Sequence, residues 1–348
     1  MINIEHRHLQ ILKKILAKYD CSFFLFGSRI SKNAKKFSDI DLLYFETLQN
    51  NILLRLEEEL EESDLPYKVD LIAYNQCDNN FKKIIDCNYV CIQTSSKLQS
   101  IEQNHLKHFE FLPKRLGFDV SETEGLRIIN CRLESSMFNI VYGVPYANYS
   151  TDFLITKIKD KFKKQAFAWW IPPSLWSSEL SQALVKAGFM IENSEHAMIC
   201  ELENLSSLEQ TTDLVVKPVL DEDLLEDFIM VLESYDHSVR RFYEMINSVH
   251  LRSLCEKLFI GYANGSAVII ATLFNNVSAS GIFTLLTREE VQSKGYGTDM
   301  MRYLLRVAKD LGSSYATLSA SSNSGYRIYE RLGFYKIGEF KCFEYKWS

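Results

Sequence analysis

The chain has 348 residues, of which 47% are hydrophobic, and a formal net charge of −6. This length predicts two or three domains, and the apolar fraction is that of a globular protein with a buried core. The negative net charge argues against a chain-wide basic surface for a nucleic-acid backbone, although a local contact with an RNA such as tRNA stays open.

Cysteine usage and hydropathy bear on the compartment. The eight cysteines show no CxxC pair or metal-binding spacing, which favours reduced thiols in an intracellular protein. Residues 1–16 carry charges throughout, unlike a signal peptide, and no apolar run approaches the roughly 20 residues of a membrane span. We therefore expect a cytoplasmic protein without a membrane partner.

The N-terminal part of the chain alternates predicted helices and strands. Helices are expected over 9–16, 50–62 and 79–87, and strands over 22–27, 39–46 and 67–74. The polar residues 94–104 predict the first domain boundary, although a helix can begin inside them.

Two aspartates interrupt the second of these strands. Asp39 and Asp41 are one residue apart and point to the same face, where two carboxylates need a cation to stay ionised. Asp70, on the next strand, is a third candidate ligand for a pair of Mg²⁺ ions. Gly27 and Ser28 end the preceding strand and are predicted to open a helix, where N–H groups and the hydroxyl can hold triphosphate oxygens.

This pattern, Gly-Ser, ten residues and then Asp-x-Asp, resembles the minimal nucleotidyltransferases of the DNA polymerase β-like superfamily over about residues 1–97. The resemblance implies Mg²⁺-dependent transfer of a nucleoside monophosphate, commonly AMP from ATP, to a hydroxyl of an antibiotic, an RNA or a protein. It makes Asp39, Asp41 and Asp70 the metal ligands, and Gly27 and Ser28 the triphosphate turn. The family often has glycine where Lys32 stands.

The middle and last parts of the chain are also mixed. In the middle part we expect helices near 102–112, 150–165 and 177–189 and strands near 125–133, 137–143, 166–171 and 197–202. A second boundary is predicted at 203–212. Beyond it we expect strands at 214–219, 257–263, 267–275, 280–287, 314–321 and 341–347, and helices at 221–235, 240–249, 298–312 and 324–334.

A glycine-rich loop, Gln292-Ser-Lys-Gly-Tyr-Gly-Thr298, lies between a predicted strand and a predicted helix. Its glycines permit close approach of a ligand to the backbone, and N–H groups at a helix start favour an anion. A Rossmann fingerprint would need a third glycine and a later acidic residue, which this stretch lacks. The succession of strand, loop, helix, strand and a closing helix that ends in Leu-Gly-Phe resembles the GNAT acetyltransferases over about 213–348.

The GNAT resemblance implies roles for named residues. Acetyl-CoA would place its pyrophosphate on the loop, its pantetheine arm near Asn323, and its departing thiolate near Tyr329 as acid, although Tyr329 can also be read as a packing aromatic. The general base is not evident, and Glu233, Asp236 and His237 are candidates that can equally be surface residues. The loop residues assigned to the pyrophosphate are Gln292, Lys294, Gly295, Gly297 and Thr298.

The middle part looks like a degenerate copy of the last part. Residues 184–202 and 329–347 both read as helix end, Gly-Phe, turn and strand, but Leu184 stands at the position of Tyr329 and the glycine loop is missing. We therefore predict that 105–205 is a non-catalytic GNAT-like half that shapes the acceptor cleft. Trp169, Trp170 and Trp176 are candidates to line that cleft, with core packing as the alternative.

The sequence thus predicts an α/β (α+β) protein with a nucleotidyltransferase domain (1–97), a degenerate GNAT half (105–205) and a catalytic GNAT domain (213–348). We expect a bifunctional transferase that uses acetyl-CoA with an amine acceptor and ATP or another nucleoside triphosphate with Mg²⁺. Either acceptor, a small molecule or a protein, stays unidentified. In the alternative, only the acetyltransferase turns over and the first domain senses nucleotide or binds a partner as in a toxin–antitoxin pair. The oligomeric state is left open.

Overall fold

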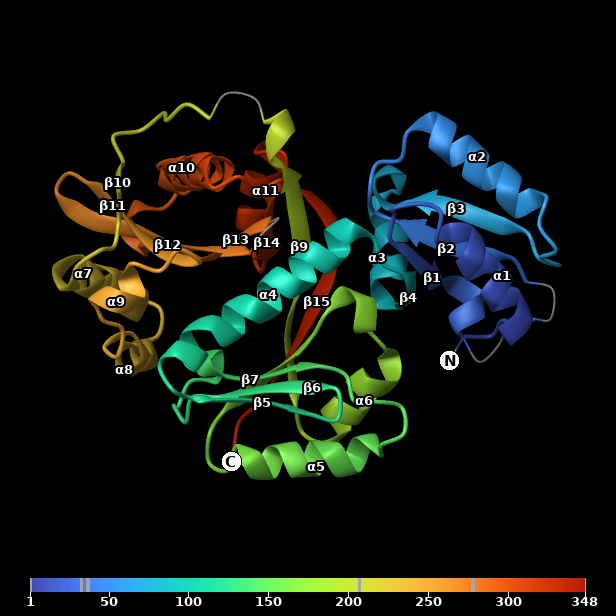
Figure 1. Cartoon of the computed structure of the whole chain (residues 1–348), viewed down its shortest axis with the longest axis horizontal. Coiled ribbons are helices and arrows are strands. Elements are labelled where there is room, and N and C mark those ends of the chain that lie inside the picture. The colour runs from blue at the N-terminus through green and yellow to red at the C-terminus, as the bar shows by residue number, and fades with distance from the viewer. Residues whose placement is uncertain (1, 32–33, 36–37, 206–207, 277–278, 348) are drawn as a thin grey trace.

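The computed structural model describes residues 2–31, 34–35, 38–205, 208–276 and 279–347. Its strands form a four-stranded sheet with the order β3-β2-β1-β4 and an eleven-stranded sheet with the order β10-β11-β12-β13-β14-β9-β15-β8-β7-β6-β5. Figure 1 shows the smaller sheet in a separate lobe beside a larger body. The chain is a mixed α/β protein, as the sequence predicts.

The N-terminal lobe packs helices on one face of its sheet. Leu12 of α1 and Leu56 of α2 share a buried cluster with Leu25 and Leu42 of the sheet. Phe24, the neighbour of Leu25, points to the other face and belongs to the core of the larger body. The elements are α1 (His6–Leu16), β1 (Phe23–Phe26), β2 (Ile40–Tyr44), α2 (Asn50–Glu61), β3 (Val69–Ala73), α3 (Asn79–Cys87) and β4 (Tyr89–Gln93). Because both faces are covered, β1 is apolar along its whole length, FFLF.

Helix α4 (Ser96–Arg115) crosses from the lobe into the larger body (Figure 1). It begins inside the polar residues 94–104, where we expected a domain boundary. Ser95 caps the helix by accepting a hydrogen bond from the Leu98 N–H, and the Asn104 side chain donates to the carbonyls of Phe274 and Ala279. The polar residues of this stretch therefore serve helix capping and buried hydrogen bonds.

The larger body consists of two halves, and each ends in the same succession of three strands, a helix, a strand, a helix and a strand. The first half contains β5 (Asp119–Thr123), β6 (Leu126–Asn130), β7 (Asn139–Gly143), α5 (Thr151–Lys161), β8 (Phe167–Ile171), α6 (Ser178–Lys186) and β9 (Met190–Glu201). The second contains β10 (Val215–Pro218), α7 (Glu222–Glu233), α8 (Arg240–Tyr243), α9 (Ser248–Leu251), β11 (Glu256–Ala263), β12 (Ser266–Asn276), β13 (Ala279–Thr287), α10 (Tyr296–Asp310), β14 (Tyr315–Ala320), α11 (Asn323–Arg331) and β15 (Tyr335–Tyr345). In both halves a parallel pair, β7 with β8 and β13 with β14, flanks the crossover helix.

The two halves exchange their last strands. Strand β9 of the first half pairs with β14 of the second, β15 of the second pairs with β8 of the first, and β9 and β15 pair with each other. Figure 1 shows both strands running side by side through the middle of the body. The sequence predicted two consecutive units, so this exchange is a finding of the structure. It brings side chains of the first half into the second.

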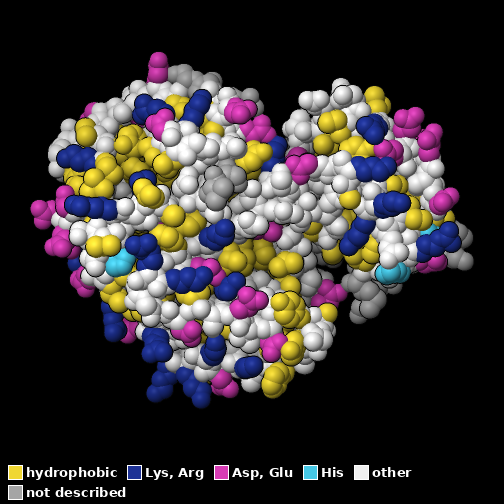
Figure 2. Space-filling model, in the orientation of Figure 1, with side chains coloured by type: hydrophobic (Ala, Val, Ile, Leu, Met, Phe, Trp, Pro, Cys, Tyr) yellow, Lys and Arg dark blue, Asp and Glu magenta, His cyan; other side chains and the backbone are white. Residues whose placement is uncertain are grey.

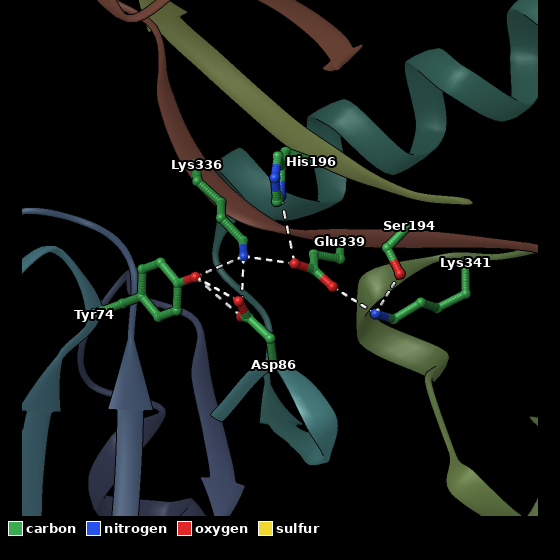
Figure 3. Close-up of polar contacts among 7 residues, drawn as sticks. All are labelled: Tyr74, Asp86, Ser194, His196, Lys336, Glu339 and Lys341. Carbon is green, nitrogen blue, oxygen red and sulfur yellow. Dashed lines mark hydrogen bonds and ion pairs between the residues drawn. The ribbon is translucent and has the colours of Figure 1, made fainter. Parts of the chain in front are cut away.

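A polar cluster joins the N-terminal lobe to the exchanged strand β15. The Lys336 ammonium lies 2.9 Å from the Tyr74 hydroxyl, 3.1 Å from an Asp86 oxygen and 2.6 Å from a Glu339 oxygen. Burial alone would raise the pKa of Glu339, but His196, Lys336 and Lys341 lower it well below the ordinary value. Figure 3 shows the cluster, which comprises Tyr74, Asp86, Ser194, His196, Lys336, Glu339 and Lys341.

The surface carries both signs of charge. Figure 2 shows lysine and arginine side chains interspersed with acidic ones on the visible face of both the lobe and the larger body. Among the described residues, we find no helix with the length and apolar character needed to span a bilayer.

Candidate functional sites

The aspartates of the N-terminal lobe meet at the ends of two parallel strands. Asp41 on β2 is paired in register with Asp70 on β3, and Asp39 precedes β2 by one residue. Burial, followed by the negative charges of Asp70 and Asp39, raises the pKa of Asp41. The Lys68 ammonium lies 2.6 Å from a carboxylate oxygen of Asp70 and partly relieves this repulsion.

The Gly-Ser turn lies directly against Asp41. Gly27 has a φ of +72°, and a Cβ at this position would lie 2.6 Å from the Asp41 carboxylate, so only glycine fits both the backbone and the space. The helix that we expected here is a 3-10 turn of four residues, Gly27–Ile30. This short helix has too few residues for a substantial helix dipole, so an anion bound there would depend on individual N–H groups and on the Ser28 hydroxyl.

The side chain of Arg29, a residue of this turn, fixes the turn to its surroundings. Its buried guanidinium donates hydrogen bonds to the carbonyls of Asn3, at 2.9 Å, and of Ser38, and stacks 4.0 Å from the centre of the Tyr67 ring. Since Ser38 precedes Asp39, the same side chain fixes both ends of the segment between Gly27 and the aspartates. Lys32, which departs from the family pattern, lies outside the described residues.

A cavity of about 400 Å³ opens beside the turn, with Gly27, Ser31 and Asp41 at its polar end and Phe26, Phe81 and Ile84 among its apolar walls. In the described part of the chain, no group of three or more His, Cys, Asp or Glu side chains is close enough to hold a metal ion. The three aspartates are therefore not arranged as a complete ligand set. Their oxygen donors and their mutual repulsion fit a hard divalent cation, and Lys68, whose side chain is 71% exposed, is free to leave Asp70.

The glycine loop of the larger body ends at an uncapped helix. Gly295 has a φ of +91° and occupies the N-cap position of α10 without a side-chain hydrogen bond to the first turn. Gly297 follows inside the first turn, where a Cβ would meet only atoms 3.9 Å away. The first N–H groups of α10 are therefore free to bind an anion.

This helix start borders a cavity of about 1110 Å³, which we call the outer cavity. Five residues singled out in the sequence line it: Gln292, Gly295, Gly297, Thr298 and Tyr329. Lys294 is exposed and Asn323 is the exposed first residue of α11, and neither is among the described residues of the lining. Two basic residues that the sequence analysis missed, Arg327 and Arg331, also line this cavity.

The strands β13 and β14 separate next to the outer cavity. Their described pairing runs from Ala279 to Gly281, while Thr284 has a φ of +52° and the register with β12 shifts nearby. Leu285 and Leu286 beyond this point line the outer cavity. Beyond the opening, β13 has no described pairing with β14, so its peptide groups can bind an extended ligand. This feature depends on strand geometry, and no residue type in the sequence indicates it.

A second cavity of about 380 Å³, the inner cavity, continues from the outer one. The two share Leu285, Leu286, Ser321 and Tyr329. The remaining lining residues come from α4, both halves of the sheet and the segment around α8: His105, His108, Phe109, Leu112, Pro113, Ile129, Met137, Phe138, Ile140, Trp170, Glu195, Leu232, Phe242, Tyr243, Glu256, Ile282, Phe283, Thr284, Leu318 and Ser319. Tyr329 thus stands where the two cavities meet.

Glu195 reaches the inner cavity because β9 is exchanged. Burial raises the pKa of this carboxyl, although a hydrogen bond from Ser319 on β14 lowers it in part. Burial and the negative charge of Glu195 together raise the pKa of Tyr329 to about 12. The carboxylate and the phenol are therefore electrostatic neighbours. The sequence analysis missed Glu195 because it looked for a base within the last part of the chain.

The bases considered from the sequence have other partners. Glu233 pairs with Arg240 at 2.6 Å, Asp236 accepts the Ser238 N–H at 2.8 Å, and His237 is exposed. All three lie outside the described linings of the two cavities. Their assignment as the base is not supported by this geometry.

The tryptophans divide between cavity and core. Trp170 lines the inner cavity, as expected for one of the three. Trp169 is fully buried and donates its indole N–H to the Gly143 carbonyl at 3.0 Å, and Trp176 is buried beneath the Lys341 ammonium. For these two, core packing is the correct reading.

Comparison with known proteins places both regions in families. Residues 10–97 match the model "Polymerase beta, Nucleotidyltransferase" and residues 220–334 match "Acetyltransferase (GNAT) family". A relative from Haemophilus influenzae, "Probable protein adenylyltransferase MntA", is 38% identical over 100 residues, which are 28% of this chain and 88% of the relative.

Solved structures of similar fold cover about two thirds of the chain. A GCN5-related N-acetyltransferase from Kribbella flavida has a TM-score of 0.55 at 14% identity, covering 70% of this chain and 96% of its own. A functionally unknown conserved protein from Staphylococcus epidermidis has a TM-score of 0.51 at 16% identity, covering 66% and 95%. The chain is therefore a transferase that belongs to the polymerase β-type nucleotidyltransferases through its N-terminal domain and to the GNAT acetyltransferases through its C-terminal domain.

Proposed function

We propose that the larger body transfers an acetyl group from acetyl-CoA to a primary amine. The observation that carries this proposal is the meeting of the two cavities at Tyr329, with a carboxylate of the other half beside it. The outer cavity takes the CoA moiety and the inner cavity takes the acceptor. The reacting carbonyl then lies next to Tyr329, Leu285 and Leu286.

Acetyl-CoA binding in this proposal uses backbone and basic groups. The N–H groups at the start of α10 hold the pyrophosphate, with Gly295, Gly297 and Thr298 around it and Gln292 at the edge. Arg327 and Arg331 add positive charge for phosphate oxygens. Lys294 and Asn323 lie at the exposed margin, outside the described lining of the cavity. The pantetheine arm lies along the unpaired side of β13.

The chemistry requires one proton to move from nitrogen to sulfur. The neutral amine attacks the thioester carbonyl, a C–N bond forms, and Glu195 takes a proton from the nitrogen. The C–S bond then breaks, Tyr329 gives its proton to the departing sulfur, and the phenol regains one from Glu195. Because its pKa is raised to about 12, Tyr329 holds its proton at neutral pH until this step.

Titration calorimetry with acetyl-CoA, followed by CoA release in the presence of a panel of primary amines, tests this activity. We expect heat of binding from acetyl-CoA alone and CoA release with at least one amine class. A folded protein that shows no heat with acetyl-CoA would contradict the proposal.

We further propose that the N-terminal domain transfers AMP from ATP to a hydroxyl. Gly27, which lines the cavity beside Asp41, and its neighbour Ser28 would hold the triphosphate. Asp39, Asp41 and Asp70 would hold Mg²⁺ that arrives with the nucleotide. The bound ion would neutralise phosphate charge in the transition state. The similarity to a protein adenylyltransferase favours a protein hydroxyl as acceptor, in this chain or in a partner.

Labelled ATP tests this second activity. Incubation with Mg²⁺, the protein and a cell lysate, followed by mass spectrometry, should show AMP adducts that disappear with EDTA and with Asp41→Asn. Adducts that persist in both conditions would contradict the assignment. Since Lys68 competes for Asp70, Lys68→Ala should retain transfer and lower the Mg²⁺ concentration that it needs.

One observation favours a regulatory role of the N-terminal domain as the second candidate. Tyr74 and Asp86 of the lobe bind Lys336 on β15, and β15 pairs with the strand that carries Glu195 (Figure 3). Acetyl transfer rates that change with ATP in the Asp41→Asn protein would support this alternative, because that variant should retain a nucleotide pocket without catalysing transfer.

A further inference from the structure

The inner cavity has walls that suit an apolar ligand body. Phe138, Phe242, Leu232 and Ile140 are buried side chains of its lining, and the His108 ring stacks on Phe283 with centroids 3.8 Å apart. An acceptor that is polar along its whole length would lose hydration against these walls without regaining hydrogen bonds. The body of the acceptor is therefore apolar.

A buried carboxylate lies in this apolar lining away from the reacting centre. Glu256 is 5% exposed, and its Oε2 atom has no hydrogen-bond partner among the described residues. The Nδ1 atom of His108 is 3.8 Å from this oxygen, beyond hydrogen-bond length, and is likewise without a partner there. Unsatisfied buried polar atoms are costly, so a donor group of the ligand fits this position.

Glu195 and Glu256 both line the inner cavity, and they come from strands that are not adjacent in the sheet. Glu195 lies on β9 and Glu256 at the start of β11, with β12, β13 and β14 between these strands in the sheet. Four strand spacings of about 4.8 Å separate the two backbones by roughly 19 Å in a flat sheet. A ligand that reaches both carboxylates is thus elongated.

We propose that the acceptor is an elongated amine whose reacting end lies beside Glu195 and Tyr329 and whose other end carries a second ammonium group bound by Glu256. An apolar stretch between the two ends lies against the aromatic walls. This proposal rests on the proposed acetyl transfer and adds the substrate class to it. A carboxylate favours an ammonium over a hydroxyl because the hydrogen bond is charge-assisted.

A matched pair of amines tests the proposal in the wild-type protein. Octylamine and 1,8-diaminooctane share the apolar stretch, and only the second carries a distal ammonium. With acetyl-CoA saturating, we expect kcat/KM for 1,8-diaminooctane to exceed that for octylamine by about 10- to 100-fold, as for a hydrogen bond to a charged group. Equal values for the two amines would overturn the proposal, as would preferential acetylation of kanamycin, a polar polycation.

Variants locate the effect within the cavity. Glu256→Gln should remove most of the preference for 1,8-diaminooctane over octylamine. Glu102→Gln is the control, because Glu102 is also a buried carboxylate but binds Ser174 outside the cavity. A preference that survives Glu256→Gln would contradict the assigned contact. Failure of the underlying activity looks different, since acetyl-CoA would then give no heat of binding or no amine would release CoA.

Discussion

The two halves of the larger body share a succession of three strands, a helix, a strand, a helix and a strand, but they differ at the start of the crossover helix and at the parallel strand pair. In the first half, Ser150 caps α5 by accepting the Phe153 N–H. Strand β7 ends at Gly143, one residue beyond its pairing with β8, and the Gly143 carbonyl accepts the Trp169 indole N–H. In the second half, α10 starts at Gly295 without a cap, and β13 parts from β14. A ligand site arises where the backbone leaves its polar groups unsatisfied, and it is lost where side chains satisfy them.

The first half, which we propose to be non-catalytic, contributes side chains to the cavities of the other half. Exchange of β9 and β15 places Glu195 next to Tyr329, and Trp170 and Phe138 of the first half line the inner cavity. The first half lacks the glycine loop and has Leu184 at the position of Tyr329, so we propose that it binds no cofactor. The comparison therefore separates cofactor binding, which belongs to the second half, from acceptor binding, which needs both.

The largest effect is expected at Glu195. Glu195→Gln keeps the shape and removes the base, so kcat should fall by about 10²–10⁴-fold with acetyl-CoA affinity unchanged. Because burial raises the pKa of Glu195, the acid limb of the wild-type pH–rate profile should lie above the range of an ordinary glutamate. Glu192→Gln on the same strand is the control. Wild-type turnover in the Glu195 variant would mean that the base is a residue of the second half or a water molecule.

Tyr329→Phe should also lower turnover, because it removes the group that donates a proton to the departing sulfur. The ring can still pack, so acetyl-CoA should bind normally through the loop, while kcat and kcat/KM fall together by up to about 10²-fold. CoA release with the best amine of the panel provides the measurement. Unchanged turnover would make Tyr329 a packing residue and leave the thiolate to solvent.

Removal of Lys336 probes the exchanged strand itself. Lys336→Met deprives the buried Glu339 of one partner and should lower the free energy of unfolding by about 2 kcal/mol at neutral pH. The folded-state pKa of Glu339 is lowered, so its contribution is full above the ordinary pKa of about 4.3 and is lost as pH falls toward the folded-state value.

Chemical denaturation of both proteins between pH 7 and pH 3 checks this. The difference in stability should shrink as the solution is acidified. Lys346→Met is the matched control, since its ion pair with Glu344 is more exposed and worth about 0–1 kcal/mol. A pH-independent difference would mean that lost packing, and not the Glu339 pair, causes the destabilisation.

The smallest effects come from matched changes at the two helix starts. Gly297→Ala adds a methyl group to the lining of the outer cavity, so it should weaken acetyl-CoA binding about tenfold. Because the new Cβ meets no atom closer than 3.9 Å and alanine suits a helix, the melting temperature should not fall. Ser150→Ala in the first half should lower stability by about 1 kcal/mol and leave acetyl-CoA affinity unchanged. Equal effects of both changes on affinity would remove the distinction between the halves.

Local signals allowed much of this architecture to be predicted. Gly27 ends one predicted strand, and Asp39 and Asp41 lie on the next. Gly295 and Gly297 lie between a predicted strand and a predicted helix, so short stretches of sequence were sufficient to identify both candidate sites. The four-residue turn at Gly27 was less accessible. It depends on burial of the Arg29 guanidinium under the turn, which no local periodicity encodes.

The exchange of strands could not be read in the same way. Pairing of β9 with β14 joins residues more than a hundred positions apart, and β9 and β15 both mix apolar with polar residues, so their sequences do not show which half they join. Glu195 lies just before the strand predicted at 197–202, so its one sequence signal was a carboxylate at the edge of a predicted strand. Without the partner strand, that signal could not distinguish a surface residue from a base.

Titration of Tyr329 tests most directly whether the first half supplies a charged group to the second. Wild-type and Glu195→Gln proteins carrying ¹³Cζ-tyrosine are compared by NMR, with Tyr329→Phe assigning the resonance, so that no acceptor is needed. We predict that the pKa of Tyr329, about 12 in the wild type, falls when the negative charge of Glu195 is removed. An unchanged pKa of Tyr329 in a folded Glu195→Gln protein would mean that the two side chains are not close together. It would thereby contradict a site formed by both halves.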